Sequence, residues 1–208
     1  MNDLILIVEN LKNSPIKQII DSKMKEFEEL GRKNSNEIFK ELCFCFLTAN
    51  FNAEGGIRIQ KEIDDGFLVL SLEELSQKLK ELGHRFPNAR ANFIFEARKY
   101  KDNIKEILDS IETDEEKRDW IVKNIKGIGF KEANHFLRNI GHKNVAIIDF
   151  HIIDLLAKNN LIEKPKTLTV KKYLEIEEIL KEISEKTNTN LGELDLYLWY
   201  EETGKILK

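Results

Sequence analysis

Residues 124–141 have the sequence Asn-Ile-Lys-Gly-Ile-Gly-Phe-Lys-Glu-Ala-Asn-His-Phe-Leu-Arg-Asn-Ile-Gly, which combines a helix end, a glycine turn and a second amphipathic helix. Glycines let the backbone approach a ligand closely, and the opening amides of a helix have no partners within the helix. We therefore expect Lys126, Gly127 and Gly129 to bind an anion such as a DNA phosphate, without recognising the base sequence. An ordinary tight turn between two packed helices is the alternative interpretation.

The rest of the chain also favours helices. The 208 residues include only 3 prolines and 10 glycines, and 34% are charged, which argues against β-sandwich, collagen-like and disordered chains. Ser71-Leu-Glu-Glu74 and Thr113-Asp-Glu-Glu116 are capping boxes, which mark helix starts. The pattern predicts an all-α fold with helices over 15–31, 35–48, 71–83, 88–100, 113–124, 131–140, 150–158, 170–185 and 191–203.

The charge is unevenly distributed along the chain. The formal net charge is -4, yet segments 76–101 and 117–144 each contain seven basic and two acidic residues. Two basic segments on an acidic body are compatible with a local surface that faces phosphates, although such runs are more often solvated helix faces. Charge therefore permits a DNA-binding protein without establishing one.

Cysteine and histidine usage argues against a metal centre. Cys43 and Cys45 are two positions apart and do not face each other on a helix, so we expect two buried thiols and no disulfide. The four histidines lack the spacing of metal ligands, and we expect neither a metal nor an organic cofactor. No apolar run has the length of a signal peptide or a membrane span, which predicts a cytoplasmic, nucleoid-associated monomer without a membrane partner.

Lys131 is an unusual residue for its position. It lies in the first turn of the second helix, where the positive end of the helix dipole disfavours a cation. The dipole and partial desolvation both favour the neutral amine, which is the form that attacks an electrophile. A lysine that contacts a DNA phosphate would explain the position equally well.

Asp149 decides between these interpretations. It ends the apolar run Val145-Ala-Ile-Ile and precedes another amphipathic segment, so it is expected to cap a helix. A helix of about ten residues after Lys131 advances about 15 Å, and the following segment can return about 23 Å when extended. The aspartate can therefore lie beside the lysine, where it can accept a proton and stabilise positive charge on a sugar at C1′.

At this point the sequence resembles the helix-hairpin-helix DNA glycosylase superfamily, which includes endonuclease III and the 8-oxoguanine glycosylases. Segments spread over almost the whole chain are similar to the archaeal-type 8-oxoguanine DNA glycosylase/AP lyases: Leu42–Asn50, Ala53–Glu62, Gly83–Phe86, Gly127–Arg138, and Leu194–Tyr200 with a Gly-Lys-x-x-Lys tail. The chain lacks the four-cysteine cluster of endonuclease III proper.

The resemblance implies a role for each matching residue. Lys131 would be the nucleophile that forms a Schiff base, and Asp149 its acidic partner. Phe86, Trp199 and the C-terminal Lys208 would line the pocket for the extruded base. Because 8-oxoguanine has an N7–H donor where guanine has an acceptor, the terminal carboxylate of Lys208 is a suitable selective group.

The resemblance also implies two helical lobes with the helix-hairpin-helix motif at the cleft. A six-helix barrel would cover residues 35–144, and residues 1–34 plus 145–208 would form a second lobe that carries the catalytic aspartate and the base pocket. A monovalent cation among the hairpin carbonyls would be compatible with this arrangement. Phe150 occupies a position where relatives usually have Lys or Arg, which predicts a missing phosphate contact.

The implied function is excision of 8-oxoguanine from double-stranded DNA and cleavage 3′ to the lesion by β-elimination, with abasic sites as further substrates. Two alternatives remain at this stage. One is an oxidised-pyrimidine glycosylase/lyase of the endonuclease III type, and the other is a non-catalytic helix-hairpin-helix module that only binds DNA.

Overall fold

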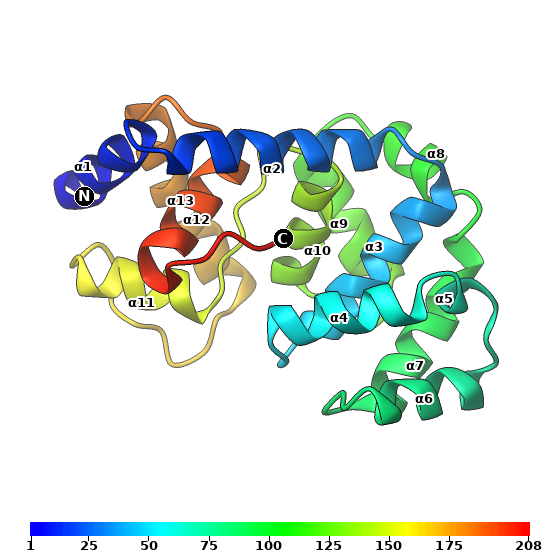
Figure 1. Cartoon of the computed structure of the whole chain (residues 1–208). Helices are drawn as coiled ribbons and strands as arrows, with labels where there is room; N and C mark the ends of the chain where they lie inside the picture. Colours follow the sequence, from blue (N-terminus) through cyan, green and yellow to red (C-terminus); the bar gives the residue numbers. More distant parts are fainter.

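The structure, a computed structural model, describes residues 1–208 and is built entirely from helices (Figure 1). In chain order these are α1 (Asn2–Lys12), α2 (Ile16–Gly31), α3 (Ser35–Thr48), α4 (Ala53–Ile63), α5 (Gly66–Val69), α6 (Leu72–Glu81), α7 (Pro87–Ala97), the 3-10 helix η1 (Arg98–Tyr100), α8 (Ile104–Asp109), α9 (Asp114–Asn124), α10 (Phe130–Asn139), α11 (Phe150–Lys158), α12 (Val170–Lys186) and α13 (Leu191–Thr203). The predicted all-α class is confirmed.

The buried apolar side chains form two separate cores. One core lies among α3 to α10, which we call the hairpin lobe, and α3 runs through it with almost every residue buried. The other core lies among α1, α2 and α11 to α13, which we call the terminal lobe. The two cores account for the two groups of helices in Figure 1, with the long helix α2 passing along both.

The chain crosses between the lobes through residues 145–148, a buried segment that belongs to no helix. A segment without a neighbouring strand needs side chains to pair its backbone groups. Asn134 Nδ2 donates to the carbonyl of Ala146 at 2.7 Å, and the Tyr173 hydroxyl both donates to that carbonyl and accepts the N–H of Ile148. The end of the crossing segment is thereby tied to α10 and to α12.

Most predicted helices are confirmed, with differences that tertiary contacts explain. The segment predicted as one helix over 88–100 is an α-helix to Ala97 followed by a 3-10 turn. Helices α1, α4, α5 and α8 were not predicted, and α4 contains Gly55 and Gly56, which disfavour helices. Gly56 nevertheless packs tightly there, since an added Cβ would lie 3.2 Å from Phe44 and from Thr48 of α3.

Gly31 ends α2 as predicted, but for another physical reason. Its backbone does not adopt the left-handed conformation typical of a glycine stop. A Cβ at this position would instead lie 2.0 Å from the carbonyl oxygen of Ile140. Glycine is therefore required by the close approach of α2 to the end of α10.

Cys43 and Cys45 are buried free thiols, as predicted, and burial raises the pKa of both. None of the helices has both the length and the apolar character needed to cross a bilayer.

Candidate active site

The hairpin between α9 and α10 places Lys131 at the start of a helix. Gly127 adopts a positive φ of +89°, and the turn is anchored by the buried side chains of Ile125 and Ile128. Gly129 is the N-cap residue of α10 and offers no side-chain acceptor to the opening amides. Lys131 is the second residue of this helix, so its side chain lies at the positive end of the helix dipole.

Asp149 occupies the same position on α11 that Gly129 occupies on α10. It is the N-cap residue, and its Oδ1 accepts the N–H of Ile152 at 3.0 Å, so the predicted cap is confirmed. The cap uses one carboxylate oxygen and leaves the other available. The starts of two helices from different lobes thus present an amine and a carboxylate to one space.

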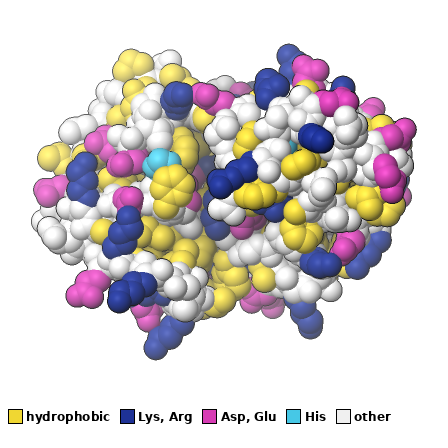
Figure 2. Space-filling model, turned by 90° about the horizontal axis from the view of Figure 1, so that it is seen from below, with side chains coloured by type: hydrophobic (Ala, Val, Ile, Leu, Met, Phe, Trp, Pro, Cys, Tyr) yellow, Lys and Arg dark blue, Asp and Glu magenta, His cyan; other side chains and the backbone are white.

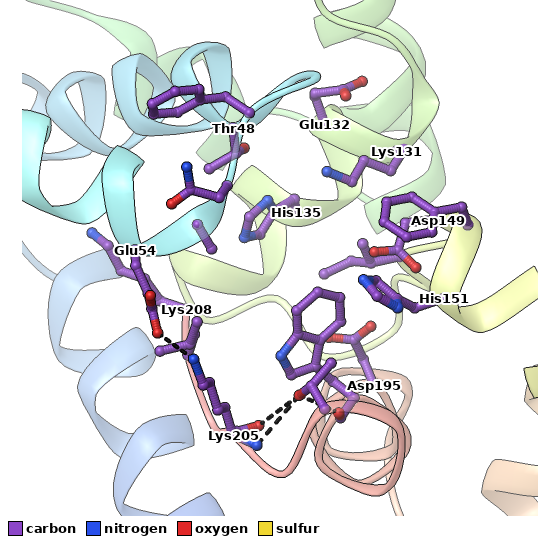
Figure 3. Close-up of a pocket in the computed structure, with 18 of the residues that line it drawn as sticks. Thr48, Glu54, Lys131, Glu132, His135, Asp149, His151, Asp195, Lys205 and Lys208 are labelled. Atoms are coloured by element: carbon purple, nitrogen blue, oxygen red, sulfur yellow. Dashed lines mark hydrogen bonds and ion pairs between the residues drawn. The ribbon is translucent and has the colours of Figure 1, made fainter. Parts of the chain in front are cut away.

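That space is a pocket of about 850 Å³ in the groove between the lobes. Figure 2 shows the molecule from below, with Lys and Arg side chains on both sides of this groove and a histidine beside hydrophobic side chains on one side. The pocket is lined by residues of both lobes and of the C-terminal tail, among them Arg85, Lys131, Glu132, His135, Arg138, Asp149, Phe150, His151, Asp195, Trp199, Lys205 and Lys208. Figure 3 shows that Lys131 and His135 project from α10 while Asp149 and His151 project from the opposite side.

Buried charges in the pocket wall affect one another. Arg138 forms an ion pair with Asp195 and also donates to Asn139. Burial raises the pKa of Asp195 to about 6; the Arg138 cation opposes this rise and the negative charge of Asp149 adds to it. The carboxyl groups of Asp149 and Asp195 are therefore electrostatically coupled.

His135 is neutral at physiological pH. Burial holds its pKa well below the ordinary histidine value, and the Arg138 and Lys131 cations act in the same direction. A hydrogen bond to the main chain of Lys208 opposes this shift, while the ring Nδ1 has no partner. An uncharged imidazole therefore lies between the candidate nucleophile and the C-terminal residue.

An aromatic wall continues from Asp149. Phe150 is 65% exposed, and its ring lies 4.0 Å from that of His151, centroid to centroid. The ring of His151 in turn meets Trp199 edge-on at 4.7 Å. The indole Nε1 of Trp199 is buried and has no hydrogen-bond partner. These three rings form a surface of the kind on which a planar base stacks.

The structure brings together four of the predicted site residues: Lys131, Asp149, Trp199 and Lys208 all line the pocket. Phe86 does not line it; its ring is 39% exposed and packs against the guanidinium groups of its neighbours Arg85 and Arg90. Its predicted contact with the base stays a prediction.

The predicted phosphate-binding residues lie outside the pocket, on the hairpin itself. Lys126 is exposed and pairs with Glu96 at 3.1 Å, and Gly127 and Gly129 are exposed. Their predicted contact with DNA also stays a prediction.

Several pocket residues escaped the sequence-based prediction although the sequence contained a signal for them. Lys131, His135 and Arg138 are spaced i, i+4, i+7 and so share one face of α10. Asp195 interrupts the apolar run Leu194-Asp-Leu-Tyr-Leu, and Glu41, which lies outside the pocket but pairs with the lining residue Lys208, interrupts the apolar helix α3. A charged residue within a buried run needs a partner, which is the signal that marks both carboxylates.

Comparison with known proteins identifies relatives over the full length of the chain. A family model described as 8-oxoguanine DNA glycosylase matches residues 20–189. The 8-oxoguanine DNA glycosylase/AP lyase of Methanocaldococcus jannaschii is 60% identical over 206 residues, which cover 99% of each chain. The enzyme of the same name from Korarchaeum cryptofilum is 56% identical over 209 residues, covering 100% of this chain and 99% of its own.

Solved structures agree with this assignment. The crystal structure of the M. jannaschii 8-oxoguanine glycosylase/lyase in complex with a 15mer DNA containing 8-oxoguanine matches with a TM-score of 0.96 and 59% identity, covering 99% of both chains. A non-covalent endonuclease III–DNA complex has 19% identity and a TM-score of 0.57 over 89% of this chain and 83% of the other, so it shares the fold. The resemblance inferred from the sequence is confirmed: the chain belongs to the 8-oxoguanine DNA glycosylase family, within the helix-hairpin-helix fold.

Proposed function

We propose that this chain is a bifunctional DNA glycosylase and AP lyase that excises 8-oxoguanine from double-stranded DNA. The observation that carries the proposal is the convergence of Lys131 and Asp149, from the starts of α10 and α11, on one pocket in the groove between the lobes. The activity named for the relatives and the lesion-containing DNA bound by one of them support the substrate class.

In the proposed reaction the Lys131 amine attacks C1′ of the damaged nucleotide and the base departs. Asp149 accepts the proton that the amine loses and stabilises the positive charge that develops on the sugar. The C1′–O4′ bond then breaks as O4′ takes up a proton, which opens the sugar ring and leaves a Schiff base between Lys131 and C1′. Loss of a proton from C2′ then breaks the C3′–O bond by β-elimination and cleaves the strand 3′ to the lesion. None of these steps calls for a redox cofactor.

The extruded base would occupy the space beside the aromatic wall. Trp199 offers a stacking surface, and Phe86, which follows the pocket-lining residue Arg85, would contact the base as well. The carboxylate of the C-terminal Lys208 would accept the N7–H of 8-oxoguanine, which guanine lacks. Extrusion of a base costs a few kcal/mol, which these contacts would offset.

The DNA backbone would lie across the groove, with a phosphate on the amides that follow Gly127 and Gly129 and with Lys126 nearby. We assign the hairpin lobe, as a six-helix barrel, to residues 35–144 and the terminal lobe to residues 1–34 plus 145–208. The two separate hydrophobic cores support this division. The enzyme would act in the cytoplasm on the nucleoid.

Borohydride trapping tests the proposed chemistry. Incubating the protein with a duplex that contains 8-oxoguanine, in the presence of borohydride, should give a covalent protein–DNA complex. Lys131→Gln should abolish this complex while retaining the fold, because the side chain lies at the pocket and not in a core. A protein that only binds DNA would form no such complex, and trapping by the Lys131→Gln variant would assign the nucleophile elsewhere.

Two further measurements sharpen the proposal. Asp149→Asn should fold normally, because Asn is an equally good N-cap, yet lose most of its excision activity. Wild-type turnover by this variant would remove Asp149 from the mechanism.

A panel of duplexes with single lesions should show preference for 8-oxoguanine, whereas a preference for thymine glycol would favour an oxidised-pyrimidine enzyme.

A further inference from the structure

The last residue of the chain is held by a buried carboxylate on α3. The Lys208 ammonium donates to Oε2 of Glu41 at 2.8 Å and also to Oε1 of Gln60 on α4. It lies 4.3 Å from the centroid of the Phe44 ring, which adds a cation–π contact. A chain terminus usually frays, so three separate contacts with one terminal side chain are a strong anchor.

The same contact balances the buried negative charge of Glu41. Its side chain is 3% exposed, and its other partners, Asn139 Nδ2 at 2.7 Å and Gln60 Nε2 at 3.0 Å, are neutral amides. A buried carboxylate is costly unless a cation balances its charge. The cation that pairs with Glu41 in this structure is the ammonium of Lys208, although 167 positions separate the two residues in the chain.

The anchored residue also contributes to the pocket wall. Lys208 lines the pocket with Lys205 and Leu207, and its main chain meets the neutral ring of His135. Figure 3 shows Lys208 and Glu54 on the side of the pocket opposite Asp149 and His151, and Figure 1 shows the tail ending between the two groups of helices. The ammonium is thus fixed to the hairpin lobe, and the residue that carries the terminal carboxylate lines the pocket.

We propose that Glu41 is a positioning residue for base recognition: by holding the Lys208 ammonium, it sets the place of the terminal carboxylate that accepts the N7–H of 8-oxoguanine. This inference rests on the proposed function. It separates two activities of one pocket, because an abasic site has no base to recognise. Glu41 therefore matters for excision of 8-oxoguanine, while cleavage at an abasic site proceeds without it.

The test compares two single-turnover rates for each variant, excision from an 8-oxoguanine duplex and strand cleavage of a matched abasic duplex. Glu41→Gln keeps the shape of the side chain and removes its charge. We expect its excision rate to fall about tenfold or more, as for loss of a hydrogen bond to a charged group, and its lyase rate to stay within about twofold. Glu182→Gln is the matched control, because Glu182 pairs with Lys186 at an exposed site on α12 and neither residue lines the pocket.

A double-mutant cycle tests whether Glu41 acts through Lys208. Lys208→Met should reduce excision, and adding Glu41→Gln to it should reduce excision no further. If Glu41→Gln does not fold, Gln60→Met replaces it, because this change removes another acceptor of the same ammonium without leaving a buried charge unpaired. The same selective loss is expected, of about threefold or more.

The outcomes are distinct. Selective loss of excision, with non-additive effects in the cycle, supports the proposal. Equal losses of excision and lyase activity in a folded variant, unchanged excision, or additive effects would each overturn it. A wild-type protein that neither excises 8-oxoguanine nor cleaves abasic DNA would instead refute the proposed function itself.

Discussion

His84 illustrates how burial fixes the protonation state of a single side chain. Its ring is buried, its Nε2 pairs with the carbonyl of Leu47 at 3.0 Å, and its Nδ1 accepts the N–H of Phe86 at 3.0 Å. Both contacts are satisfied only by the neutral ring. Burial accordingly lowers the pKa of His84.

This lowered pKa predicts acid sensitivity. Below about pH 6.5 the unfolded chain takes up a proton on His84 and the folded chain does not, so the free energy of unfolding decreases as the pH falls. The melting temperature of the wild type should therefore drop further between about pH 7 and pH 5 than that of His84→Gln. His135 and Asp195 titrate in both proteins and cancel in the comparison. Parallel melting curves for the two proteins would contradict this assignment.

At the scale of the element, the hairpin depends on Gly127 for two reasons. Its φ is +89°, which is strained for any residue with a side chain, and a Cβ would lie 2.6 Å from the Phe93 ring. We expect Gly127→Ala to cost about 2 kcal/mol or more of unfolding free energy, measured by denaturant titration. Gly83→Ala is the control, since Gly83 has φ +80° but no atom within 4 Å of the added Cβ. It should cost only about 1 kcal/mol, and equal costs would show that the Phe93 contact is harmless.

The crossing segment 145–148 is a second element that local sequence does not hold in place. The Tyr173 hydroxyl pairs with the backbone of Ala146 and Ile148 and accepts Asn134 Nδ2 at 3.2 Å. Tyr173→Phe leaves the buried N–H of Ile148 without a partner and should cost about 1–3 kcal/mol of unfolding free energy. Tyr197→Phe should cost much less, because that hydroxyl forms no hydrogen bond within the protein although its residue is buried in the same core. Similar losses in the two variants would mean that the hydroxyl pairing contributes nothing specific.

At the scale of the whole molecule, a buried ion pair joins the lobes. Arg118 of α9 donates to both carboxylate oxygens of Glu177 of α12, at 3.0 and 3.2 Å, and stacks 4.7 Å from the centroid of the Phe130 ring. Both side chains of the pair are almost fully buried. The relative placement of Lys131 and Asp149 therefore rests on polar contacts between lobes as well as on the crossing segment.

Breaking this pair from one side should be costly. Glu177→Gln leaves the Arg118 cation buried with only the exposed Asp119 nearby, and we expect a loss of about 3 kcal/mol or more in the free energy of unfolding. The double variant Arg118→Met with Glu177→Leu removes both charges and should recover most of the loss, since well-packed apolar residues replace buried ion pairs without penalty in other proteins. A double variant as unstable as the single one would show that the pair holds the lobes together by more than charge balance.

Local sequence determined most of the helices and their N-terminal caps. It also determined that Lys131 and Asp149 lie at the starts of two of these helices. The capping boxes at Ser71 and Thr113 depend on contacts three residues apart, and so does the cap at Asp149. The position of Lys131 in the first turn of α10 follows from the two glycines before it. Such features are predictable because their partners are neighbours in the chain.

Only the tertiary structure decided which distant groups meet at the pocket. Glu41 pairs with the last residue of the chain, and Arg138 pairs with Asp195 of another lobe, so neither pairing leaves a periodic trace in the sequence. Phe86 lies beside the pocket instead of lining it, because its ring packs on two arginines. Burial of charge demands a partner without specifying which one, and the packing of the two lobes supplies that choice.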